Sequence, residues 1–170
     1  MSKIFLDLDG TVRRTKSGAT FINEPFDQEL IPGVKEAIAR HQDDIIIGIT
    51  NQGGVGAGFK TIKNCLLEQQ ETLRLIPEMV AIYLCPDGGN SLWAVGRDEQ
   101  GFKTHEFLRT RFYQAFRKPD CGMLQYACTD LFNSEIPLSS LMVGDRPEDE
   151  QAAKNAGINF MWAEDWRNGT

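Results

Sequence analysis

The sequence predicts an α/β fold, a three-layer sandwich in which helices cover both faces of a central parallel sheet. Short apolar runs alternate along the chain with segments of helical spacing. This alternation is typical of a parallel sheet whose strands are buried on both faces. Polar clusters follow several of the runs, as expected where strand ends meet at a binding site. The 170 residues suffice for one such domain, so we expect a single domain over residues 1–170.

The predicted strands are short runs of consecutive apolar residues, which indicate burial on both faces of a sheet. In chain order they are Ile4–Leu8, Ile45–Ile49, Val80–Leu84, Leu141–Val143 and Asn159–Trp162.

Apolar residues at helical spacing predict a helix in the segments between these strands. Pro32-Gly33 punctuates the start of the first helix, Pro77 ends the second, and Gly157 stops the last. In chain order the predicted helices cover residues 34–41, 62–76, 107–115, 123–131 and 150–156.

Two polar, glycine-containing segments interrupt the alternation. Arg13–Glu29 follows the first predicted strand and Pro86–Lys103 follows the third. Loops of this length in a compact domain are usually functional or disordered. Both leave from the carboxyl ends of strands, so we expect them to border the substrate.

Composition limits the classes of function. The chain has 18 Lys and Arg against 24 Asp and Glu, a net charge of −6, which argues against broad, non-specific nucleic-acid binding but permits a local basic groove. No apolar run is long enough to span a bilayer and no signal peptide is visible, so we expect a cytoplasmic protein without a membrane partner. The cysteines are expected to be free thiols. They are Cys65, Cys85, Cys121 and Cys128.

Two carboxylates, Asp7 and Asp9, come directly after the apolar residues Ile4–Leu6. Residues i and i+2 of an extended segment point to the same side, so the two side chains can converge just past the strand end. Converging carboxylates repel each other, and a bound cation or a division of labour between nucleophile and acid would explain the arrangement. On this segment alone, a tight turn around Asp9-Gly10 remains an equal alternative.

The ends of later strands supply complementary groups. Thr50-Asn51-Gln52-Gly53 follows the second run, Arg117-Lys118 precedes the fourth predicted helix, and Gly144-Asp145-Arg146 follows the fourth run. Each group has a structural alternative, such as a helix cap for Thr50 or a solvated side chain for Lys118. Their ordered occurrence at successive strand ends favours one common site.

These residue types suit phosphoryl transfer. Asp7 can attack phosphorus and hold it as an aspartyl phosphate, while Asp9 protonates the leaving oxygen and then activates water. Asp7 and Asp145 would be side-chain ligands of Mg²⁺, which favours carboxylate oxygens. The groups expected to bind the phosphoryl oxygens are Thr50, Asn51 and Lys118.

Together these motifs resemble those of the haloacid dehalogenase superfamily, over nearly the whole chain. Asp7–Thr11 is similar to its first motif, Thr50 to its second, Lys118 to its third, and Gly144–Asp149 to its fourth. Residues 50–55, 117–123 and 143–146 resemble, more narrowly, a subgroup. It contains histidinol-phosphate phosphatases, heptose-bisphosphate phosphatases and the phosphatase domain of polynucleotide kinase 3'-phosphatases.

The resemblance implies a Rossmann-like fold with little or no separate cap domain. It also implies Asp7 as nucleophile, Asp9 as acid and base, and Mg²⁺ held by Asp7, the Asp9 carbonyl and Asp145. The full catalytic set is then Asp7, Asp9, Thr50 and Lys118. We expect the substrate to be bound by Asn51, Gln52, Gly53, Arg117 and Arg146.

Two details bear on the substrate. Bacterial metabolite phosphatases of the subgroup carry a structural zinc, but Asp87 stands where a histidine would be, and Gln114 and Phe116 stand where cysteines would be. A lone Cys85 cannot build a tetrahedral site, so we predict no zinc, which weakens the heptose and histidinol readings. Conversely, residues 9–21 resemble the 3'-phosphatase pattern. They place three cations beside the site, Arg13, Arg14 and Lys16. These side chains either contact a nucleic-acid backbone or form a solvated basic loop.

The sequence therefore predicts a Mg²⁺-dependent phosphomonoesterase. Its substrate is a phosphorylated small metabolite or a 3'-phosphorylated nucleic-acid end. A non-hydrolytic receiver-like module is the alternative, because receivers also pair strand-end carboxylates with Thr and Lys. Asp9 favours turnover, since a receiver needs no acid there. The sequence carries no signal of oligomeric state.

Overall fold

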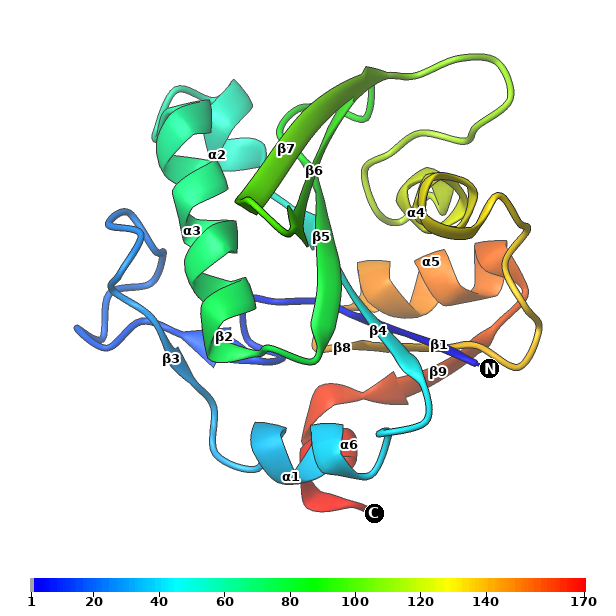
Figure 1. The fold of residues 1–170 in the computed structure, drawn as a ribbon, viewed down its shortest axis with the longest axis horizontal. Helices are drawn as coiled ribbons and strands as arrows, with labels where there is room; N and C mark the ends of the chain where they lie inside the picture. Colours follow the sequence, from blue (N-terminus) through cyan, green and yellow to red (C-terminus); the bar gives the residue numbers. More distant parts are fainter. Residues whose placement is uncertain (1) are drawn as a thin grey trace.

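The computed structural model describes residues 2–170 and contains a central sheet of seven strands (Figure 1). These strands are β1 (Lys3–Leu6), β4 (Ile45–Asn51), β5 (Met79–Cys85), β6 (Ser91–Asp98), β7 (Gly101–Leu108), β8 (Leu141–Gly144) and β9 (Asn159–Trp162). Their spatial order is β7-β6-β5-β4-β1-β8-β9. The five strands β5, β4, β1, β8 and β9 pair in parallel with their neighbours. The strands β6 and β7 extend the sheet beyond β5 as antiparallel strands.

Helices cover both faces of this sheet, which confirms the predicted α/β class. On one face lie α1 (Val34–Ala39), α3 (Ile62–Leu75) and α6 (Ala163–Asn168), and on the other α4 (Gly122–Phe132) and α5 (Pro147–Ala156). The alternation within β1 shows why: Ile4 and Leu6 pack into the first core cluster, whereas Phe5 packs into the second. A strand buried on both faces needs apolar residues at consecutive positions.

Local signals explain most helix ends. The Thr61 hydroxyl caps α3 by accepting a hydrogen bond from the Asn64 N–H at 3.1 Å. Gly157 ends α5 in the left-handed conformation with φ +70°, which confirms the predicted stop. Two short helices have no counterpart in the predicted set, α6 and α2 (Gly53–Gly56). No helix within residues 2–170 combines the length and apolar character needed to cross a bilayer.

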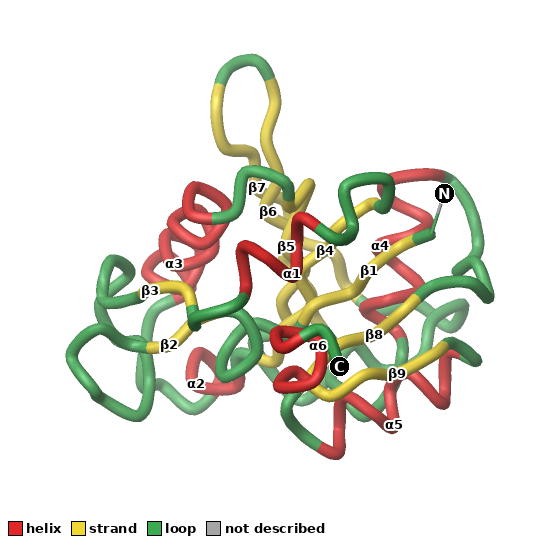
Figure 2. The backbone as a smooth tube through the Cα atoms, turned by 90° about the horizontal axis from the view of Figure 1, so that it is seen from below, coloured by secondary structure: helices red, strands yellow, loops and turns green. Residues whose placement is uncertain are grey.

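The predicted helix over 107–115 and the predicted loop Pro86–Lys103 are both wrong. Residues 91–108 instead form the β6–β7 hairpin, which projects from the edge of the sheet (Figure 2). Apolar residues near 107–115 fit a helical period, but only some of them are even half-buried. Phe107 stacks on Tyr126 with ring centroids 4.2 Å apart, whereas Phe112 is 77% exposed. Pairing with the free edge of β5 decided the outcome, and local spacing carries no information about that edge.

The polar segment after β1 is also partly ordered. Its two ends pair as a small antiparallel sheet of β2 (Arg13–Arg14) and β3 (Glu29–Leu30), which lies beside α3 (Figures 1 and 2). The predicted free thiols are confirmed, and all four are buried.

Candidate active site

The polar strand ends meet at one edge of the sheet. β1 pairs in parallel with β4 on one side and with β8 on the other, so their carboxyl ends lie together. Asp7 follows β1 directly, and its N–H donates to the Val143 carbonyl at 3.0 Å. Thr50 stands near the end of β4, and Asp145 follows β8. The topology alone therefore brings three of the predicted site residues together.

Lys118 is the cation at the centre of this edge. Its ammonium donates to Asp7 Oδ1 at 2.7 Å, to Asp149 Oδ1 at 2.6 Å and to the Ile49 carbonyl at 3.1 Å, which uses all three of its protons. Burial alone lowers the pKa of Lys118, but the carboxylates of Asp7 and Asp149 outweigh it and hold that pKa above its ordinary value. Lys118 is therefore a fixed positive charge beneath Asp7.

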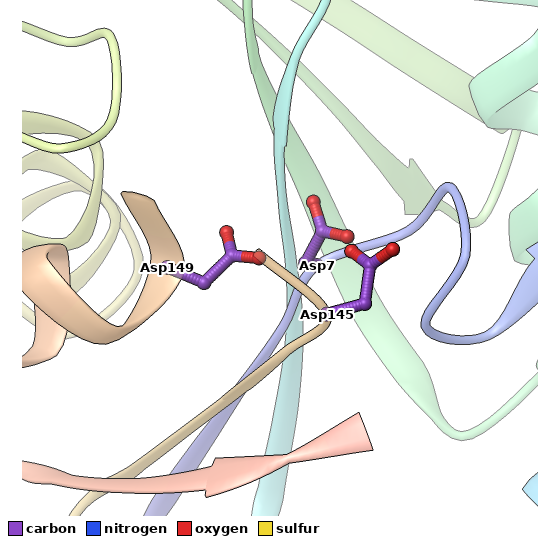
Figure 3. Close-up of side chains that lie close together, drawn as sticks. All are labelled: Asp7, Asp145 and Asp149. Carbon is purple, nitrogen blue, oxygen red and sulfur yellow. The ribbon is translucent and has the colours of Figure 1, made fainter. Parts of the chain in front are cut away.

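Three carboxylates surround a common point: ligand atoms of Asp7, Asp145 and Asp149 lie within 4.8 Å of one another (Figure 3). Burial, and then repulsion from Asp149, raise the pKa of Asp7 to about 7 against the opposing effect of Lys118. Asp149 is the least exposed of the three, with 2% of its side chain accessible against 11% for Asp7, and it accepts from Lys118 and the Arg146 N–H. The crowded oxygens of Asp7 and Asp145 thus fit a hard divalent cation.

Gly10 leaves the space that Asp145 occupies. Its φ is +84°, a left-handed conformation that favours glycine, and a Cβ there would lie 2.2 Å from Asp145 Oδ2. The Thr11 hydroxyl next in sequence donates to Asp7 Oδ2 at 3.0 Å. The turn at Gly10-Thr11 therefore helps to position the carboxylates of both Asp7 and Asp145.

Asp9 lies beside this cluster and is held from two sides. Its Oδ1 accepts from Arg13 Nε and its Oδ2 from Gln52 Nε2, each at 2.9 Å. Burial raises the pKa of Asp9, but the charge and hydrogen bond of Arg13 and then the bond from Gln52 outweigh burial and lower it. Asp9 is thus a carboxylate in the substrate-free protein.

The basic loop predicted at Arg13, Arg14 and Lys16 is wrong for Arg13. The Arg13 side chain is fully buried because it pairs with Asp9 and reaches α3. Arg14 pairs instead with Glu29 at 2.9 Å. Arg13 is therefore not available to a nucleic-acid backbone.

The second-motif amides are occupied by protein partners. Asn51 makes two hydrogen bonds of 3.0 Å with the backbone of Lys118, one as donor and one as acceptor. Gln52 Nε2 bonds the Thr50 hydroxyl at 2.9 Å as well as Asp9. Both side chains, predicted to bind substrate, position other site residues here.

The remaining predicted substrate-binding residues lie around the cluster. Gly53 begins α2 against the exposed Arg117, since a Cβ on Gly53 would approach the Arg117 guanidinium to 2.9 Å. With Gly56, Asp87 and Gly88 they line an open hollow of about 410 Å³. The Arg146 side chain is exposed, and its backbone opens α5.

Asp87 organises the loop that borders this hollow. Its Oδ1 accepts from the N–H groups of Gly89 at 2.8 Å, Asn90 at 3.0 Å and Ser91 at 3.3 Å, and its Oδ2 accepts from the Ser91 hydroxyl at 2.8 Å. Burial raises the pKa of Asp87, but these bonds outweigh burial and lower it. A carboxylate thus orders the turn that leads into β6.

Sequence reasoning missed a buried ionic cluster behind Asp9. Besides Arg13 it contains Lys60 and Glu68, which pair at 2.6 Å. The available signal was the polar stretch Glu68-Gln69 with Thr72 on α3, a helix that must bury one face. The role of Asp149, undecided in the sequence, now includes a direct bond to Lys118.

The fold and the site define a class: an α/β enzyme with converging carboxylates, a buried lysine and a hydroxyl at the carboxyl edge of a parallel sheet. A sequence model of the polynucleotide kinase 3 phosphatase family matches residues 3–166. The chain belongs to this family, within the phosphatases of the haloacid dehalogenase superfamily, and it is a phosphoric monoester hydrolase.

Curated relatives agree with this assignment. The D-glycero-D-manno-heptose-1,7-bisphosphate 7-phosphatase of Thermosynechococcus vestitus is 30% identical over 162 residues, covering 91% of this chain and 74% of the relative. The corresponding β-heptose enzyme of Haemophilus ducreyi is 30% identical over 169 residues, covering 91% and 78%. The crystal structure of D,D-heptose 1,7-bisphosphate phosphatase from B. bronchiseptica, complexed with magnesium and phosphate, is 27% identical. It has a TM-score of 0.66 and covers 94% of this chain and 79% of that one.

Proposed function

We propose that this chain is a Mg²⁺-dependent phosphomonoesterase that works through an aspartyl phosphate and acts on a phosphorylated small metabolite. The single observation that carries the proposal is the contact of the buried Lys118 ammonium with Asp7, at 2.7 Å. This contact fixes the Asp7 carboxylate beside the half-exposed Asp9 and the exposed Asp145. The nucleophile and the proton carrier are thus separate carboxylates, and Asp145 adds a third carboxylate as a cation ligand.

In the first half-reaction an oxygen of Asp7 forms a bond to phosphorus as the bond from phosphorus to the leaving oxygen breaks. Asp9 donates its proton to that oxygen. The negative charge of a bound phosphate raises the pKa of the adjacent Asp9, which favours the protonated form needed here. In the second half-reaction Asp9 takes a proton from water, and the water oxygen bonds to phosphorus. The bond from phosphorus to Asp7 then breaks and releases inorganic phosphate.

Mg²⁺ would be held by Asp7, Asp145 and the backbone carbonyl of Asp9. When bound, it neutralises negative charge on the phosphoryl oxygens and the crowded carboxylates. The Thr50 hydroxyl would donate to a phosphoryl oxygen at the same edge, and the buried Lys118 ammonium would supply a fixed positive charge beside the phosphoryl group. A solved relative complexed with magnesium and phosphate supports this assignment.

We propose that no zinc takes part. Asp87 orders the loop after β5 through four hydrogen bonds, the ordering that a structural zinc would otherwise provide. Phe116, at a position where a cysteine ligand would be needed, is buried in an aromatic cluster with Phe107 and Tyr126. The loop therefore has a metal-free support.

A small sugar phosphate fits this site better, as a substrate, than a 3'-phosphorylated nucleic-acid end does. The relatives are named for heptose bisphosphates, and a second phosphate could reach Arg117 in the hollow of about 410 Å³. Arg13, the first cation of the expected nucleic-acid loop, is buried.

We propose one catalytic domain over residues 1–170, with the β2–β3 segment as its minimal cap.

The decisive experiment compares substrates side by side. A heptose 1,7-bisphosphate, a simple sugar monophosphate and a 3'-phosphorylated oligonucleotide are assayed for phosphate release with Mg²⁺, after EDTA, and after Mg²⁺ is restored. We expect preference for the bisphosphate, loss of turnover in EDTA and recovery with Mg²⁺. Preference for the oligonucleotide would contradict the proposed substrate class. A stable phosphoprotein without phosphate release would instead favour the receiver-like alternative.

Replacing Gly10 should damage the metal site selectively. Gly10→Ala forces a methyl group against Asp145 Oδ2, so we expect a turnover about 10- to 100-fold lower and a higher Mg²⁺ requirement. Gly18→Ala is the matched control, because Gly18 has a similar φ of +82° but nothing within 4 Å of its added Cβ. Equal Mg²⁺ titrations for the two variants would show that Gly10 does not shape a metal site.

A further inference from the structure

Five side chains form a closed ring beside the active-site edge, here called the Asp9 ring. Arg13 Nε and Gln52 Nε2 each donate to Asp9, to different oxygens, at 2.9 Å. The Lys60 ammonium joins Gln52 Oε1 at 3.2 Å to Glu68 Oε1 at 2.6 Å. The Arg13 guanidinium lies 3.5 Å from Glu68 Oε2, which closes the ring.

The ring is buried and its formal charges balance. The side chains of Arg13 and Glu68 are 0% exposed, whereas that of Asp9 is 49% exposed. Burying ion pairs rarely adds stability, because desolvation offsets the attraction between the charges. The arrangement is therefore better explained by what it does to its one open member, Asp9.

Arg13 is itself held rigidly from α3. Its Nη1 donates to Gln69 Oε1 at 2.9 Å and to Thr72 Oγ1 at 2.6 Å. A planar guanidinium with this many partners has one orientation, so the direction of its Nε–H toward Asp9 is fixed. On the other side, Gln52 ties Asp9 to Thr50 of the phosphoryl site. The carboxylate thus cannot rotate without breaking a bond on either side.

We propose that Arg13 is a positioning residue that aims the Asp9 carboxyl at the leaving oxygen of the substrate. This inference rests on the proposed function of Asp9. Arg13 does not touch the substrate, because it lies beneath Asp9 with no exposed surface. The Glu68–Lys60 pair serves the same end by anchoring Arg13 and Gln52 at the back of the ring.

A misplaced acid and a general loss of structure can be told apart by comparing two substrates with different leaving groups. An alkyl phosphate has a poor leaving group and needs a proton delivered as the bond breaks. An aryl phosphate such as 4-nitrophenyl phosphate leaves as a stable anion and needs little such help. Misplacing Asp9 should therefore slow the alkyl substrate far more than the aryl substrate.

The test measures kcat/KM with Mg²⁺ for 4-nitrophenyl phosphate and for a sugar monophosphate. We expect Arg13→Met to lower kcat/KM for the sugar phosphate by about 10²- to 10⁴-fold. The fold loss in kcat/KM for the aryl phosphate should be less than a tenth as large. Arg13→Lys should restore part of the difference, because it keeps the charge but loses the fixed fork. Arg74→Met, at an exposed arginine of α3 that pairs with Glu71 outside the ring, should change neither value.

A second variant guards against misfolding. Arg13→Met alone leaves Glu68 with less compensation, whereas Arg13→Met/Glu68→Met removes both charges of the pair, and the same substrate ratio is expected. Equal losses on both substrates, in either folded variant, would overturn the positioning role. If Asp9→Asn itself spares the sugar phosphate, the proposed function of Asp9 fails. If Asp9→Asn discriminates and Arg13→Met does not, only the present inference fails.

Discussion

Asp7→Asn is expected to abolish turnover while the protein stays folded. The amide cannot attack phosphorus, so we expect a loss of about 10⁴-fold or more in kcat with any phosphomonoester. The neighbouring carboxylates have other roles: Asp149 is held by Lys118 and the Arg146 N–H, Asp9 is held by Arg13 and Gln52, and Asp145 would hold the cation. The measurement is phosphate release with Mg²⁺ at saturating substrate.

The same variant should fold normally. Burial raises the pKa of Asp7 to about 7, so a neutral amide removes a costly buried charge. Lys118 keeps its bonds to Asp149 and the Ile49 carbonyl. We therefore expect a melting temperature close to that of the parent, as for the matched control Asp43→Asn at an exposed position.

A covalent readout separates the role of nucleophile from that of metal ligand. Acid quenching during turnover should trap a phosphoryl group on the peptide that contains Asp7, and Asp7→Asn should lack it. Parent-like turnover in folded Asp7→Asn, or a phosphoryl group on another residue, would exclude Asp7 as the nucleophile.

The parts of this site that sequence predicts well are those set by short-range geometry. An apolar run that ends at Asp7 places the next carboxylates beyond a strand, and parallel strands end at the same edge. Thr50 and Asp145 reach that edge for the same reason. The fold class follows from similar local patterns, whereas the β6–β7 hairpin was misassigned and α2, α6 and the β2–β3 pair were not predicted.

The parts that sequence could not predict depend on distant partners. Arg13 appears in a basic segment, yet its partners Gln69 and Thr72 lie 56 and 59 positions away. Neither spacing nor charge pattern encodes that contact, so a buried arginine was interpreted as part of a loop that either contacts nucleic acid or is solvated. The β6–β7 hairpin fails for the same reason, since its place is set by the edge of β5.

Lys118→Met is expected to cause the largest loss of stability of any single change in this site. It leaves Asp7 and Asp149 buried with no compensating cation, and breaking a buried pair in this way costs about 3–5 kcal/mol. For a domain of this size we expect the melting temperature to fall by about 6–20 °C. Turnover should fall as well, because the fixed charge beneath the phosphoryl group is lost.

The stability deficit should shrink as pH falls. Lys118 lowers the pKa of Asp7, so without it the folded-state pKa of Asp7 rises further above its unfolded value and the folded form binds more protons than the unfolded form. The contribution of Asp7 is then favourable below the unfolded pKa and is lost as pH rises through the folded pKa. We therefore expect the gap between Lys118→Met and the parent to be wider at pH 8 than at pH 5, in thermal melts recorded without metal.

Two further variants decide whether the buried charges cause the loss. Lys118→Met/Asp149→Asn removes one stranded carboxylate, so part of the stability should return. Lys154→Met breaks only an exposed pair with Glu150 and should cost about 0–1 kcal/mol. If Lys118→Met melts like Lys154→Met, with the same pH dependence as the parent, the lysine does not compensate Asp7. The contact on which the proposed mechanism rests would then lack energetic support.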